Sequence, residues 1–134
     1  MKKYDLLRSG DAIIRVLEVQ EDRVLVIDCI KRTMPVWVEM MVLESYFECT
    51  SVELFEVTEI ITAEVDTLDA DQRKTMYERY TMIAPILSFV ADDGMRSRLI
   101  GSMAEEYRVS KQTVRSYLCL YLSYMDVTAL VPKH

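Results

Sequence analysis

The chain has 134 residues, of which 51% are apolar, and it carries a net charge of −6. This length allows one domain or two small ones, and the composition excludes a disordered or fibrous chain. The acidic average argues against a nucleic-acid partner, but residues 1–93 carry −9 and residues 94–134 carry +3. Such asymmetry is typical of a basic working face joined to an acidic body, although solvated charge placed by chance is the alternative.

The first third of the chain is rich in β-forming residues. Two runs dense in Val and Ile, residues 11–20 and 23–32, are separated by polar residues, which predicts a hairpin. The second run has four consecutive apolar residues, so we expect both faces of this ribbon to be partly covered. After a break at Pro35, Val36–Val38 offers a third short strand. Together these predict a small SH3-like β-barrel or a curled antiparallel sheet of three to five strands.

Residues 39–64 carry weaker patterns. Leu43–Phe47 is compatible with the end of a short helix, and Ser51–Thr58 alternates well enough to predict a strand. A domain boundary is expected at Asp66–Asp69, with Asp69 capping the next helix. The predicted organisation is α+β, with a β-rich domain at residues 1–65 and a helical domain at residues 66–134.

From Ala70 the apolar residues follow a helical period. One apolar stripe is predicted, and its members are Met76, Tyr80, Ile83, Leu87 and Val90. Pro85 lies inside this stripe, so the helix should kink there, or end near Ala84 and restart.

Residues 95–125 have the pattern of a helix-turn-helix. A first helix at about 95–107 carries the small residue Ala104, which allows a second helix to cross closely. Ser110 is suited to cap that second helix, and Val114, Tyr117 and Leu118 should face the first. Arg108 occupies the turn where Gly is common, and a left-handed conformation there would cost on the order of 1 kcal/mol.

The outward face of the second helix is the predicted DNA-binding site. Residues at the start of such a helix meet base edges in the major groove; here these are Lys111, Gln112, Arg115 and Ser116, with Thr113 at the edge. Residues better placed for phosphates are Ser110, Thr113, Arg108, Arg96 and Arg98. The alternative is a three-helix bundle whose polar face is only solvated.

Residues from about 73 to 134 resemble the DNA-binding region of Mu-like and TnsB-like DDE transposases of bacteria, which lies before their catalytic domain. The matching pieces are Tyr80–Leu87, Val109–Tyr121 and the tail Ala129-Leu130-Val131-Pro132. Met125-Asp126 stands where the family usually has a Gly before the tail. The resemblance implies recognition of transposon-end duplex DNA, with other transposition proteins as possible partners. The family's three metal-binding carboxylates have no counterpart here, so we expect no enzymatic activity.

Other residues argue against a catalytic or metal site. The only histidine is His134, and Cys29, Cys49 and Cys119 form no CxxC pair, so we expect buried reduced thiols and no cofactor or metal. No apolar run approaches the roughly 20 residues of a membrane span, and we expect a cytoplasmic protein without a small-molecule substrate. Two further functions stay open: a stand-alone transcriptional regulator, and a protein-interaction module without DNA binding.

Overall fold

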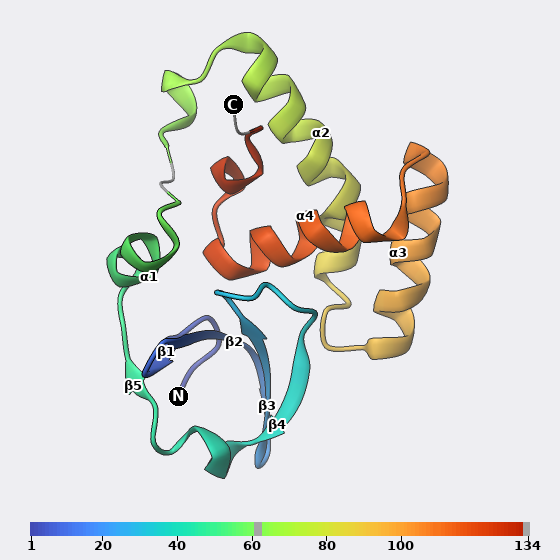
Figure 1. Ribbon diagram of the computed structural model, residues 1–134. Helices are drawn as coiled ribbons and strands as arrows, with labels where there is room; N and C mark the ends of the chain where they lie inside the picture. Colours follow the sequence, from blue (N-terminus) through green and yellow to red (C-terminus); the bar gives the residue numbers. More distant parts are fainter. Residues whose placement is uncertain (61–62, 133–134) are drawn as a thin grey trace.

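The computed structural model describes residues 1–60 and 63–132 and has an α+β architecture, with an open antiparallel sheet followed by helices. The sheet has the order β4-β3-β2-β1-β5. Its strands are β1 (Leu6–Ser9), β2 (Ala12–Gln20), β3 (Arg23–Asp28), β4 (Val36–Glu39) and β5 (Phe47–Glu48). The helices are α1 (Ser51–Thr58), α2 (Ala70–Leu87), α3 (Asp93–Tyr107) and α4 (Lys111–Tyr124), with 3-10 turns η1 (Met40–Leu43), η2 (Val65–Thr67) and η3 (Val127–Leu130). Figure 1 shows α4 lying across the end of the sheet.

The predicted hairpin is confirmed, because β2 pairs with β3 across a turn at Glu21-Asp22. In β3, Leu25 and Ile27 enter the core shared with the helices, whereas Val24 and Val26 enter a smaller core on the opposite face. This explains the four consecutive apolar residues, since both faces of the strand are covered. The sheet is not closed, so the curled sheet is the correct alternative and the barrel is wrong.

The irregular alternation of β2 has a structural cause. The pairing register with β3 shifts between Val16 and Glu18. Before the shift, the odd-numbered Ile13 faces the helices and the even-numbered Val16 faces the smaller core. After the shift, the odd-numbered Val19 packs against the smaller core. A bulge of this kind inserts one residue and resets which face each side chain occupies.

Two expectations for residues 39–64 are wrong. Residues 51–58 form the helix α1 and not a strand, because Thr50 and Glu53 make a capping box. The Thr50 hydroxyl accepts from the Glu53 amide at 3.2 Å, and the Glu53 carboxylate accepts from the Thr50 amide at 2.8 Å. The short helix expected to end at Phe47 is instead a 3-10 turn ending at Leu43, since Phe47 pairs with β1.

Helix α2 begins as predicted, with Asp69 accepting a hydrogen bond from the Gln72 amide at 2.7 Å. It continues through Pro85 and ends at Leu87, so the expected end near Ala84 is wrong. Pro85 lies in the last turn of the helix and its side chain is exposed. No helix among the described residues is both long and apolar enough to cross a membrane.

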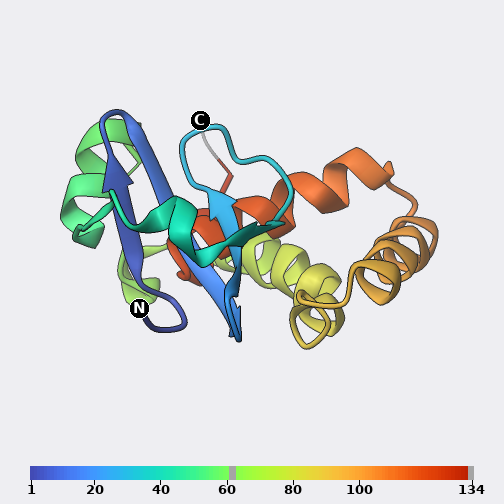
Figure 2. The ribbon, with the colours of Figure 1, turned by 90° about the horizontal axis from the view of Figure 1, so that it is seen from below.

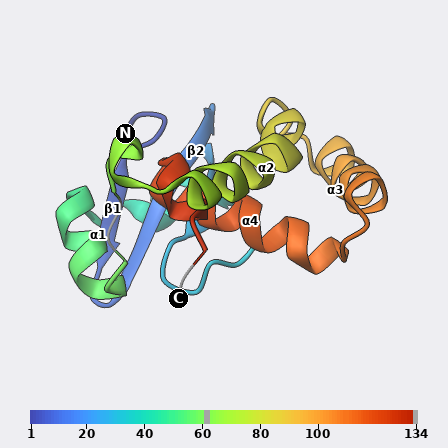
Figure 3. The same ribbon diagram turned by 90° about the horizontal axis from the view of Figure 1, so that it is seen from above.

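The main hydrophobic core joins the sheet to the helices. It contains Ile13 and Ile27 from the sheet, Leu54 from α1, and Leu118 from α4 in one cluster. One core therefore spans the expected boundary near residue 65, and α1 lies before that boundary together with the sheet. In Figures 2 and 3, α3 and the start of α4 project at one end of the molecule, and α1 lies at the other.

Candidate nucleic-acid interface

The α3–α4 pair has the geometry expected of a helix-turn-helix. A three-residue turn, residues 108–110, joins the two helices, and Arg108 adopts the left-handed conformation with φ 55° and ψ 45°. The Ser110 hydroxyl accepts from the Thr113 amide at 3.0 Å and so caps α4. Both features agree with the sequence analysis, including the strained non-glycine residue in the turn.

The inward face of α4 is as predicted at Val114 and Leu118. Val114 and Leu118 are fully buried, and Ala104 of α3 is buried in the same cluster. Tyr117 is only partly buried and lies beside α2, where the Arg79 guanidinium sits 4.8 Å from its ring centre. Helices α2, α3 and α4 all contact one another, so the motif is held in a three-helix arrangement.

The outward face of α4 carries the predicted base-contacting residues. Lys111, Gln112 and Ser116 are exposed, whereas Arg115 is half-buried. Within residues 1–60 and 63–132, neither Lys111 nor Arg115 forms a salt bridge. The acidic half of the molecule therefore does not neutralise either cation by a direct ion pair, and both charges remain available to an anion.

The predicted phosphate-contacting residues fall into three groups. Arg98 and Arg108 are exposed, as a phosphate contact requires. The hydroxyls of Ser110 and Thr113 hydrogen-bond to each other at 2.9 Å within the cap. Arg96 is buried: it donates to the Val90 carbonyl at 2.6 Å and lies 3.2 Å from the Asp93 carboxylate. We leave Arg96 out of the interface, because this guanidinium stabilises the α2–α3 connection and cannot reach a phosphate.

The structure adds residues that sequence reasoning missed. The loop after β3 lies against α4 and forms a groove with it. The groove is lined by Lys31, Arg32, Thr33, Met34, Gln112, Arg115, Ser116 and Cys119. The only sequence signal was the pair of adjacent cations at the end of an apolar run, which did not indicate contact with a helix much later in the chain.

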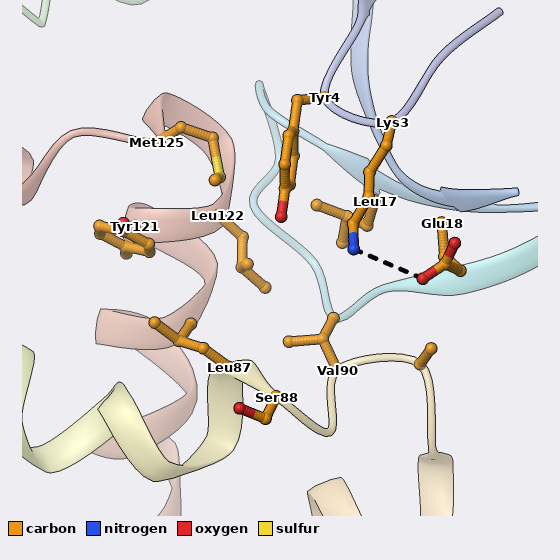
Figure 4. A pocket seen from close by; sticks show the side chains of 11 residues that line it. Lys3, Tyr4, Leu17, Glu18, Leu87, Ser88, Val90, Tyr121, Leu122 and Met125 are labelled. Carbon is orange, nitrogen blue, oxygen red and sulfur yellow. Dashed lines mark ion pairs between the residues drawn. The ribbon is translucent and has the colours of Figure 1, made fainter.

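A second hollow, of about 180 Å³, lies between the amino terminus, the end of α2 and the end of α4 (Figure 4). Its walls combine apolar side chains such as Leu17 and Leu122 with the rings of Tyr4 and Tyr121. Lys3 and Glu18 at its edge form an ion pair at 3.5 Å, so their charges are already matched. This hollow offers no uncompensated charge to a ligand.

The thiols are in unreactive surroundings. Cys29 and Cys119 are buried, Cys49 is half-buried, and all three are free. Burial raises the pKa of Cys29 to about 12 and that of Cys119 to about 11, so neither is a thiolate near neutral pH. In the part of the chain that the structure describes, no three metal-ligating side chains come together.

The site geometry is the main basis for assigning a function. Comparison of the chain with protein-family models and with curated proteins found no match.

Proposed function

We propose that this chain binds duplex DNA through α3 and α4, with the start of α4 in the major groove. One observation carries the proposal: Lys111, Gln112 and Ser116 form an exposed polar surface on a capped helix whose opposite face is fixed in the core. The side chains at the start of a recognition helix are those that meet base edges. The exposed surface lies within the basic part of the chain, which carries +3 from residue 94 onward.

Each side chain has a role that follows from its chemistry. Arg115 and Lys111 can donate to the acceptors of guanine, and Gln112 can pair with adenine. Arg98 and Arg108 are exposed on or beside α3 and fit phosphate contacts, which hold the register of the protein without selecting sequence. Ser110 and Thr113 keep the helix start in place through the cap and contribute less directly.

The biological setting we propose is the amino-terminal portion of a bacterial transposase or integrase that recognises transposon ends. This rests on the resemblance of Tyr80–Leu87, Val109–Tyr121 and the tail at residues 129–132 to that family. The portion proposed here binds DNA and other transposition proteins, and the strand-transfer chemistry would belong to a catalytic domain.

The test is binding of fluorescent random-sequence duplexes, followed by selection of the duplexes bound best. Lys111→Ala combined with Arg115→Ala should weaken binding to selected duplexes by about 1–3 kcal/mol per base-contacting residue. Sequence preference should relax as well, because these side chains would contact base edges. Anisotropy measurements at several salt concentrations give both the affinity and its salt dependence.

The matched control is Arg73→Ala combined with Lys74→Ala. These adjacent cations are exposed at the start of α2, so the control removes the same charge from another helix. Equal weakening in both double variants would show that only net charge matters and would reject the α4 interface. Absence of binding to any duplex at low salt would reject the proposed function itself.

A second function, protein interaction, is favoured by exposed apolar residues in the segment from η1 to α1. Met41 is 70% exposed, Phe47 77% and Val52 60%. Exposed apolar side chains are typical of surfaces that contact another protein where they form one contiguous patch. A stand-alone regulator would use such a surface to form a dimer that contacts two half-sites. Light scattering that shows a strict monomer would disfavour the regulator.

A further inference from the structure

The loop between β3 and β4 lies on the side of α4 (Figure 1). The Asp28 carboxylate accepts from the amides of Ile30 and Lys31, both at 2.9 Å, and the Arg32 amide donates to the Asp28 carbonyl at 2.8 Å. At the far end of the loop, the Cys119 thiol donates to the Met34 sulfur at 3.4 Å. The position of the loop relative to the helix is therefore part of the folded structure.

The groove between this loop and α4 is positively charged. Lys31, Arg32 and Arg115 line it together with the neutral donors Thr33, Gln112 and Ser116. None of the described residues that line it carries a carboxylate. Asp28, the acid just before the loop, is committed to two backbone amides and sits outside the lining.

Three cations around one groove repel one another, and a bound anion relieves that repulsion. The three charges are neighbours, because Lys31, Arg32 and Arg115 line the same groove. The groove is continuous with the proposed DNA-contacting face, since Gln112, Arg115 and Ser116 belong to both. Residues three and four apart on a helix share one side, which places this stripe along the loop.

We propose that the β3–β4 loop is a second DNA-contacting element, and that Lys31 and Arg32 bind the phosphodiester backbone beside the groove that α4 enters. This inference rests on the proposed function and extends the DNA-binding surface to the loop that follows β3. The loop contributes affinity that does not depend on sequence, because phosphates are the same at every step. Arg115 lies between the two elements and can contact either a base edge or a backbone phosphate beside the loop.

The test compares Lys31→Gln combined with Arg32→Asn against the parent protein on random-sequence duplexes. Asn is chosen because Arg32 has a positive φ of 53°, which Asn tolerates better than most residues. We expect the slope of log affinity against log salt to become shallower by about 0.9 for each phosphate that the variant no longer binds. Sequence preference among selected duplexes should not change. The control, Arg73→Gln combined with Lys74→Gln, should keep the parent slope.

The outcomes separate the two proposals. If the parent binds duplexes and the loop variant keeps the slope of the parent, the loop does not touch DNA and only α4 binds it. If the loop variant and the control show the same decrease in slope, bulk charge explains the effect and the inference is overturned. If the parent binds no duplex, the proposed function fails together with the loop's role.

A titration with inorganic phosphate distinguishes a free anion from the DNA backbone. We expect no saturable rise in the melting temperature at constant ionic strength, because an open groove holds a single phosphate weakly. A saturable rise in the parent that is absent from the loop variant would assign the groove to a free anion instead and overturn the inference. Melting curves of both variants also confirm that each one folds.

Discussion

The two halves of α4 differ sharply in their surroundings. Lys111, Gln112 and Ser116 in the first half are exposed, whereas Leu118, Cys119 and Leu122 in the second half are buried. Helix α4 as a whole packs on β2 and β3 as well as on α2, α3 and η3. One helix thus provides a polar surface at its start because its end is anchored in the core. The position of the proposed DNA-binding face is determined by the buried residues of α4, from Val114 near its start to Leu122 near its end.

The anchor includes an unusual polar contact. The Arg15 guanidinium is buried; its Nε donates to the Ser123 carbonyl at 3.0 Å and its Nη1 to the Tyr4 carbonyl at 2.8 Å. Burial lowers the pKa of Arg15, and the negative end of the α4 dipole favours a cation at this place. The sheet therefore holds the end of α4 by charge as well as by apolar packing.

The largest expected effect comes from removing the anchor. Leu118→Ala should lower the free energy of unfolding by about 2–5 kcal/mol, because it leaves a cavity at a fully buried position. Urea unfolding followed by circular dichroism measures this. Ser116→Ala, on the exposed half, should change stability by about 0.5 kcal/mol or less. Similar decreases in both variants would remove the distinction between the halves.

Alkaline pH should lower the free energy of unfolding through a buried thiol beside the end of α4. The Cys29 thiol has a pKa raised to about 12 in the folded protein from an ordinary value of 9.0. Its stabilising contribution is complete below pH 9 and disappears as the pH rises toward the folded value, a decrease of about 2–3 kcal/mol by pH 11. Unfolding curves at several pH values, in the presence of a reductant, measure this decrease.

Two cysteine variants sharpen this prediction. Cys29→Ala should reduce the alkaline dependence without abolishing it, because burial also raises the pKa of Cys119 to about 11. Cys49→Ala should keep most of the dependence, since Cys49 is only half-buried. An unchanged pH dependence in Cys29→Ala would show that another group is responsible.

The smallest effect is expected beside the exposed half. Gly101 lies inside α3, and a Cβ there would meet only the Lys111 Cε at 3.7 Å, an ordinary van der Waals distance. Gly101→Ala should therefore raise the free energy of unfolding by about 0.4–1 kcal/mol, chiefly by restricting the unfolded chain. A destabilised variant would mean that the Lys111 side chain needs the space, and parallel DNA-binding measurements would then show weaker binding.

Local signals explain what could be predicted from the sequence. The Ser110 cap, the buried Val114 and the hairpin of β2 and β3 each depend on neighbours within a few residues. Residues 51–58 show where such signals compete. Their alternating apolar residues favoured a strand, but the capping box of Thr50 and Glu53 and the burial of Leu54 favour the helix that forms.

Contacts between distant parts of the chain could not be predicted in this way. Even the contact of Arg96 with the Val90 carbonyl, six residues earlier, could not be predicted, because the turn from Phe89 to Asp92 and not helical periodicity brings the two groups together. The loop at Lys31 and Arg32 meets α4 because of the path that β3 takes in the fold. No pattern in either segment indicates that the two are in contact. The position of β4 at the open edge of the sheet likewise could not be predicted, because it depends on the order in which the strands pair.

The Arg15–Ser123 contact has a consequence for how this protein can be divided. Joining residues 66–134 to an unrelated protein would leave Leu118 and Leu122 facing water and the end of α4 without its buried cation. The helix-turn-helix is thus not an exchangeable cassette, and a graft would have to carry the sheet with it or supply a new apolar cover. Among related proteins, substitutions in the sheet should therefore be accompanied by compensating substitutions in the last two turns of α4.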